Sequence, residues 1–188
     1  MVTPGVSLKI KTKKEAKVIL KQLKALTGYR VLVGVPEEND PRETGEKIGN
    51  AGLAYIHDNG SPLRGIPARP FMRPGIAKAQ RQISINLKIA AAALLDGTKE
   101  GVLIALNTAG MIAQNSIRNV ILAGEGFAPL KRSTLLGRLR RRKGLSMKYK
   151  KPGMKAQKEE FLGSLKPLID TAEMLKSISY IVEEPSND

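Results

Sequence analysis

Two long stretches of the chain repeat apolar residues at the spacing of an amphipathic helix. The first, residues 74–95, has an inward stripe formed by Ile76, Ile83, Leu87, Ala90, Ala91 and Leu94. The second, residues 99–122, has a stripe formed by Val102, Leu106, Ala109, Ala113, Ile117 and Val120. The polar run DGTKE separates the two stretches, so the pattern predicts a pair of long antiparallel helices.

The second of these predicted helices carries a group of small residues on its apolar side. They are Ala105, Ala109, Gly110 and Ala113. Small side chains let another part of the chain come close to a helix. We therefore expect a neighbouring backbone to pack closely against this helix.

Shorter helical patterns precede the long ones. Residues 13–26 place five apolar residues on one helical face: Ala16, Ile19, Leu20, Leu23 and Leu26. Residues 48–59 also have helical spacing, and Gly60 follows them as a typical C-terminal cap.

Three further segments indicate the sheet. Residues 6–12 alternate apolar and polar positions, residues 29–35 form an apolar run typical of a buried strand, and residues 177–182 predict a last strand after a short helical turn at 171–176. Together the elements predict one α+β domain over residues 1–188, with a small antiparallel or mixed sheet packed against the two long helices.

The segment GSPLRGIPARPFMRPGIAKAQ, residues 60–80, interrupts the helical pattern with four prolines, three glycines and three arginines. Residues that precede proline are driven to extended geometry, so residues 66–71 are expected to be extended, and Pro74 suits the first turn of the next helix. We interpret residues 61–74 as an extended, proline-rich arm that docks on a neighbouring subunit. The alternatives are an active-site loop and a stiff crossover between two helices of the same chain.

The arm has apolar and cationic side chains that suit a subunit interface. Its predicted contact residues are Arg64, Ile66, Pro67, Arg69, Pro70, Phe71, Met72 and Arg73. Prolines reduce the entropy that such a segment loses when it packs on a partner.

Charge adds a second candidate surface. The sequence of 188 residues has a net charge of +15, and residues 131–151 contain ten Lys or Arg and no acidic residue. We expect a long, basic, irregular loop at residues 124–160. It would bind either the DNA backbone or an acidic protein through Lys131, Arg132, Arg138, Arg140, Arg141, Arg142, Lys143, Lys148, Lys150 and Lys151. A solvated loop that orders on a protein partner is the competing interpretation.

Residues suited to catalysis are few. The one histidine, His57, adjoins Asp58 on a predicted helix, where neighbouring residues point in different directions. The sequence has no cysteine and no phosphate-binding glycine motif. We therefore predict no catalytic residue, no metal site and no cofactor, and interpret the protein as not an enzyme. The N-terminus has no signal-peptide pattern, and the run IAAAALL is too short to span a bilayer, so no membrane partner is expected.

Three motifs in order carry a resemblance. The stretch AYIHDNGSPLRGIPARPFMRPGI (54–76), the segment GFAPLKRSTLLGRLRRRKG and the closing stretch KPLIDTAEMLKSISYIV (166–182) resemble signatures of the phage virion-morphogenesis proteins. These are tail-completion and head–tail joining proteins of long-tailed phages. The match covers roughly residues 50–182. The chain departs from it at Phe127, where Trp is usual, in a longer basic loop, and at Ala172, where Gly is usual. Alanine there predicts a helical rather than a left-handed turn before Glu173.

The resemblance implies a structural virion protein at the neck or the top of the tail, assembled in the host cytoplasm. It implies a ring, commonly of six subunits, around the DNA channel, with neighbouring neck or connector proteins and the tail terminator or tail tube as partners. Genomic double-stranded DNA in the channel is a further expected contact. The alternative from the residues alone is a free DNA-binding protein that acts in packaging or regulation.

Overall fold

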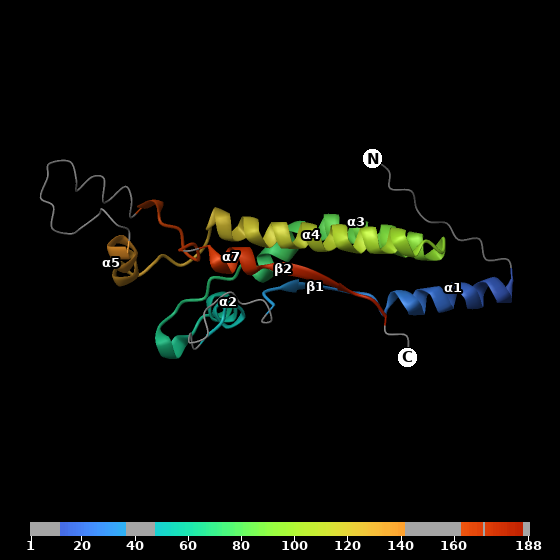
Figure 1. Ribbon diagram of the computed structural model, residues 1–188, viewed down its shortest axis with the longest axis horizontal. Coiled ribbons are helices and arrows are strands. Elements are labelled where there is room, and N and C mark those ends of the chain that lie inside the picture. Colours follow the sequence, from blue (N-terminus) through green and yellow to red (C-terminus); the bar gives the residue numbers. More distant parts are fainter. Residues whose placement is uncertain (1–11, 37–47, 142–162, 171, 186–188) are drawn as a thin grey trace, which may run out of the picture. The chain divides into compact units, whose positions relative to one another are not determined.

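The computed structural model describes residues 12–36, 48–141, 163–170 and 172–185 (Figure 1). Its helices and strands are α1 (Lys13–Leu26), β1 (Arg30–Gly34), α2 (Asn50–Asn59), the 3-10 turn η1 (Pro62–Arg64), α3 (Met72–Leu95), α4 (Lys99–Ala123), α5 (Arg132–Arg141), α7 (Glu173–Ser177) and β2 (Ser179–Glu183). The α+β class is confirmed: two long helices pack against a small antiparallel sheet.

The chain divides into two compact units. Unit 1 comprises Met1–Gly34, Gly75–Ser116 and Ser179–Asp188, and unit 2 comprises Val35–Pro74 and Ile117–Ile178. Helices α3 and α4 each contribute to both units, so the interpretation of residues 1–188 as a single domain stays a prediction.

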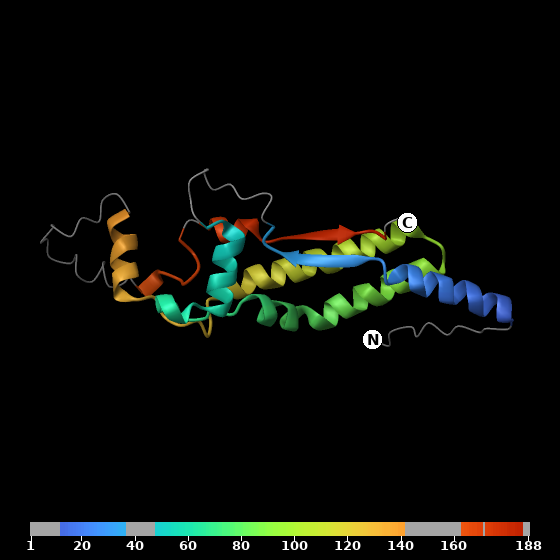
Figure 2. The same cartoon turned by 90° about the horizontal axis from the view of Figure 1, so that it is seen from below.

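Unit 1 is built on the antiparallel pair of α3 and α4, which cover one side of the two-stranded sheet (Figures 1 and 2). Its core is a cluster of Ala90, Val102, Ala105 and Leu106. Partly buried side chains of α3, of both strands and of the residue before β1 pack against this cluster: Tyr29, Val31, Ala93, Leu94 and Val182. The sequence pattern thus identified the helical pair and its core.

The two predicted helical stripes have different outcomes. Every residue of the α4 stripe is buried, which confirms it. The α3 stripe is wrong in part, since Ile76 and Leu87 are 43% and 44% exposed. The buried residues of α3 are Gly75, Ala79 and Ala90. Because this helix packs through its smallest residues, larger side chains that flank them lie at the edge of the contact.

The sheet has one covered and one open face. Strands β1 and β2 are antiparallel, with Val31 opposite Val182, Leu32 opposite Ile181 and Val33 opposite Tyr180. Val31 and Val182 pack on the core cluster, whereas Leu32 and Ile181 are 50% and 52% exposed. The prediction of a buried strand at residues 29–35 is therefore wrong for one face, because side chains alternate along a strand and α3 and α4 cover only one side.

Gly110 of α4 is a point of close approach, as the small residues predicted. A Cβ built on Gly110 would lie 2.3 Å from Cδ2 of Tyr180. The neighbour is therefore an aromatic ring from β2, not the backbone that we expected.

Helix α1 has the predicted bounds, but its apolar face is not buried. None of its described side chains is fully buried, and Leu20 is 58% exposed. The amide of Gln22 donates a 3.4 Å hydrogen bond to the Leu95 carbonyl, which ties α1 to the end of α3. The side chains of Leu23 and Leu26, and the strand predicted at 6–12 apart from Thr12, lie outside the described residues.

The turn before α7 corrects the expectation for Ala172. Its φ of 62° and ψ of 10° are left-handed, although we expected alanine to make this turn helical. The Ala172 carbonyl accepts a 3.0 Å hydrogen bond from the Lys176 amide, so the strained residue also begins the first turn of α7. The left-handed conformation brings the Cβ of an L-residue close to the following carbonyl oxygen.

Replacing Ala172 with glycine is expected to raise the free energy of unfolding by about 0.5–1 kcal/mol, because glycine adopts this conformation without steric cost. Urea unfolding checks it as a higher midpoint at an unchanged m-value. Ala77→Gly, on the exposed side of α3, is the matched control and should lower stability by about 0.5–1 kcal/mol. A loss of stability in both variants would contradict the prediction.

Candidate interaction surface

The proline-rich arm is anchored by an aspartate that precedes it. The Asp58 carboxylate accepts hydrogen bonds from the backbone amides of Phe71 and Met72, at 2.7 and 3.0 Å. These amides begin α3, so Asp58 caps that helix across the arm. Sequence reasoning treated Asp58 only as a neighbour of His57. The missed signal is a short acidic residue that stands before a proline-rich connection between two helices. Such a residue can cap the helix that follows the connection.

Two of the predicted arm contacts lie inside the chain itself. Arg69 is only 5% exposed, and its guanidinium donates to the carbonyls of Ala128 and Pro129 at 2.8 and 3.1 Å. Phe71 is fully buried. The exposed Ala68 and Pro70 alternate with them, as expected for an extended chain that rests on its own unit.

Arg69 and Phe71 are therefore corrected from subunit contacts to internal anchors. At these two positions the segment behaves as the alternative interpretation described it, as a stiff crossover between two helices of the same chain. The other predicted contacts are more accessible. Ile66, Pro67 and Met72 are half-buried, whereas Arg64, Pro70 and Arg73 are exposed.

The beginning of the arm forms a small closed turn. Ser61 and Ile66 pair as an antiparallel bridge, and η1 lies between them. Gly60 and Gly65 have φ angles of 79° and 58°, which residues other than glycine rarely adopt. Leu63, at the apex of the turn, is fully exposed. The turn thus holds a large apolar side chain in solvent on a backbone that its own hydrogen bonds fix.

This turn meets the start of the basic run. A Cβ built on Gly65 would lie 3.1 Å from Nζ of Lys131. The exposed side chains of Leu63, Arg64 and Lys131 are called the tip surface below. Residues 66 positions apart in sequence are thus brought together, which sequence reasoning did not predict. The tip surface can bind a partner through one apolar contact with positive charges beside it.

The described part of the basic run is partly a helix. Arg132–Arg141 form α5, where we expected an irregular loop. Leucine and arginine favour a helix, and together they outweigh the single Gly137. Lys131, Arg132 and Arg140 are exposed. The side chain of Arg141, and all of Arg142, Lys143, Lys148, Lys150 and Lys151, lie outside the described residues.

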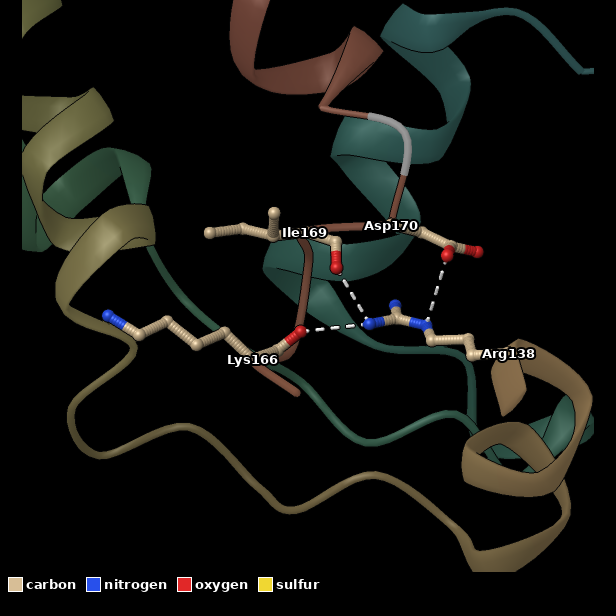
Figure 3. A network of polar contacts seen from close by, with 4 residues as sticks. All are labelled: Arg138, Lys166, Ile169 and Asp170. Atoms are coloured by element: carbon tan, nitrogen blue, oxygen red, sulfur yellow. Dashed lines mark hydrogen bonds and ion pairs between the residues drawn. The ribbon is translucent and has the colours of Figure 1, made fainter. Parts of the chain in front are cut away.

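Arg138 is corrected from a partner contact to a structural residue. It is 9% exposed, and its Nη1 donates to the carbonyls of Lys166 and Ile169 at 2.9 and 2.7 Å (Figure 3). Its Nε lies 3.6 Å from the Asp170 carboxylate. A guanidinium has five N–H donors in a planar fork, which suits several acceptors at once. Arg138 therefore fastens α5 to residues 166–170 and has little surface left for DNA.

The buried arginines also act on His57. Burial lowers the pKa of the His57 imidazole from its usual value of 6.5, and the charges of Arg69 and Arg138 lower this pKa further. Its Nδ1 is buried and has no hydrogen-bond partner. This environment is that of a half-buried histidine that packs beside two buried cationic side chains.

We expect the protein to lose stability as the pH falls below about 6.5. At higher pH His57 is neutral in the folded and in the unfolded chain. At lower pH the unfolded chain takes up a proton that the folded chain, with its lowered pKa, resists, so the free energy of unfolding decreases until the folded pKa is reached. Urea unfolding between about pH 7.5 and 5 measures the slope.

His57→Gln removes the titrating group, and its pH dependence should be flatter over the same range. The comparison is direct because His57 is the one histidine of the sequence. An equal slope in the two proteins would refute the assignment to His57.

Among the described residues, no group of three or more histidine, cysteine, aspartate or glutamate side chains is placed to hold a metal ion. No helix in the same part of the chain combines the length and apolar character needed to cross a membrane. No protein family model, curated protein or solved structure matches the chain. The resemblance to virion-morphogenesis proteins therefore stays a prediction.

Proposed function

We propose that this protein is a structural component of a tailed bacteriophage that forms a ring at the head–tail junction and joins the tail to the head around the DNA channel. The observation that carries the proposal is the tip surface, in which the fully exposed Leu63 stands on a fixed turn beside Arg64 and Lys131. The three ordered motifs of the sequence support the same function.

The tip surface suits assembly because its geometry is set before any partner binds. Asp58 and Arg69 hold the arm at its end, and the Ser61–Ile66 bridge closes the turn. A segment that is already ordered loses less conformational entropy when it docks. Of the residues that we first assigned to the interface, the accessible ones then contact the neighbour, while Arg69 and Phe71 support them from inside.

A phage that lacks this gene provides the main test. Negative-stain microscopy of the lysate should show DNA-filled heads beside separate, complete tails. Supplying Leu63→Asp in trans should leave the defect, whereas Tyr55→Asp, which changes an exposed aromatic residue of α2 in the same unit, should restore virions. Normal virions without the gene, or heads that never fill with DNA, would refute the neck assignment.

A free DNA-binding protein is the second candidate. The exposed Lys131, Arg132 and Arg140, with the net charge of +15, favour it. Binding to phosphates releases counterions, so the affinity for duplex DNA should fall steeply with salt, with a logarithmic slope of about −0.9 for each phosphate contact. Weak binding that salt does not change would exclude this alternative.

A further inference from the structure

Helix α1 presents an apolar face that its own chain does not bury. Leu20 is 58% exposed, and Ala16 and Ile19, which share its side of the helix, are half-buried. The remaining surface of the helix carries five exposed lysines: Lys13, Lys14, Lys17, Lys21 and Lys24. In most proteins the stability of an amphipathic helix comes from packing of its apolar face, so a partner for this face is expected.

The sheet of the same unit has an equally open face. Leu32 and Ile181 lie directly opposite each other on adjacent strands, and half of each side chain is exposed. Arg30 and Glu183 form the next outward pair, and both are exposed. Helices α3 and α4 cover only the other side of the sheet (Figure 1). A sheet with an apolar face is normally covered by a second layer, most often a helix or another sheet.

The two open faces do not cover each other within one chain. In both views α1 continues beyond the end of the sheet (Figures 1 and 2), and the exposure of Leu20, Leu32 and Ile181 agrees with this. The chain thus has one uncovered helix face and one uncovered sheet face, which together would make the missing layer.

We propose that α1 of one copy packs on the outer face of the β1–β2 sheet of the next copy. The lengths agree, because a helix of 14 residues is about 21 Å long and strands of 5 residues are about 17 Å long. The charges agree as well, since the lysines that flank the apolar face of α1 would come close to Glu183, which is exposed on the outer face of the sheet. Glu184 does not contribute, because it pairs with Lys99 of α4 in its own chain.

The contact joins two different surfaces, so it is heterologous when each pair of copies makes it once. It then repeats from copy to copy and produces a closed ring or an open filament, whereas a reciprocal exchange of α1 between two copies would stop at a two-fold dimer. The choice of a ring over a filament rests on the proposed function. The contact of α1 with the sheet is a second subunit contact, in addition to the tip surface.

Disulfide trapping tests the contact directly, because the sequence contains no cysteine of its own. The full chain is prepared as Leu20→Cys and, separately, as Ile181→Cys, both at exposed positions. After mild oxidation of the mixture, a non-reducing gel should show a cross-linked pair that contains one of each protein. Neither protein alone should form this pair, since disulfides require a Cα separation of about 4.4–6.8 Å.

The doubly substituted chain distinguishes the arrangements. Leu20→Cys/Ile181→Cys should give a ladder of cross-linked copies. A disulfide within one chain at monomer mass, a pair formed by Ile181→Cys alone, or no cross-link at all would each overturn the proposal. Leu20→Cys mixed with Ile104→Cys, an exposed residue of α4 in the same unit, is the matched control and should stay unlinked; linkage there would mean non-specific collision.

The outcome is independent of the microscopy. A ladder together with normal virions in the gene deletion would support the contact and refute the neck function. Separate heads and tails without a ladder would refute the contact and support the neck function.

Discussion

Replacing Phe71 with alanine is expected to lower the free energy of unfolding by about 3–5 kcal/mol, the largest effect of any single truncation proposed for this chain. The ring of Phe71 is fully buried, and its backbone amide is bound by Asp58 at the start of α3. Alanine would remove the apolar contacts of the ring and leave a cavity at the point where the arm joins the helix. Urea unfolding, followed by far-ultraviolet circular dichroism, measures the loss as a lower midpoint.

Leu63→Ala is the control for this prediction. Leucine and phenylalanine are both large apolar residues of the same arm, but Leu63 is fully exposed, so its truncation should change stability by less than about 0.5 kcal/mol. Equal losses at the two positions would show that Phe71 is not an internal anchor. It would then return to the set of candidate subunit contacts.

Gly110→Ala is expected to destabilise the protein by about 1–3 kcal/mol, the cost of overpacking a close contact. The added Cβ would lie 2.3, 2.7 and 2.9 Å from three carbon atoms of the Tyr180 ring, so either the ring or the strand must move. Gly110 is in the middle of α4, where alanine would otherwise favour the helix by about 1 kcal/mol. The sign of the change in the free energy of unfolding therefore shows which effect is larger, the steric contact with Tyr180 or the helix propensity of alanine.

Two variants separate these contributions. Gly137→Ala on α5 meets no atom within 4 Å and should stabilise the chain by about 0.5–1 kcal/mol through helix propensity alone. In a Tyr180→Ala background, Gly110→Ala should likewise become neutral or stabilising, which a double-mutant cycle reports as a coupling energy. A gain of stability from Gly110→Ala in the otherwise unchanged protein would contradict the packing of Tyr180 against α4.

The candidate surface changed more between sequence and structure than the fold did. The arm was predicted as an extended segment over residues 61–74, whereas Pro62–Arg64 form a 3-10 turn and α3 already begins at Met72. Its exposed residues remain candidates for a subunit interface. Arg69, Phe71 and Arg138 were assigned to partners but lie buried in unit 2. An arginine in a basic run has the same local pattern whether it faces solvent or a group of carbonyls, so the sequence does not distinguish these cases.

What the sequence by itself determined is the set of elements that depend on local spacing. The bounds of α1, the pairing of α3 with α4 and the buried stripe of α4 all follow from apolar periodicity, because a helix repeats its faces every 3.6 residues regardless of what it packs against. The tertiary structure alone decided which face is covered and which side chains meet. Lys131 lies beside Gly65, and Tyr180 lies on Gly110, because these outcomes depend on segments far apart in the chain. Such long-range contacts decide the cost of each local conformation, and no local pattern records them.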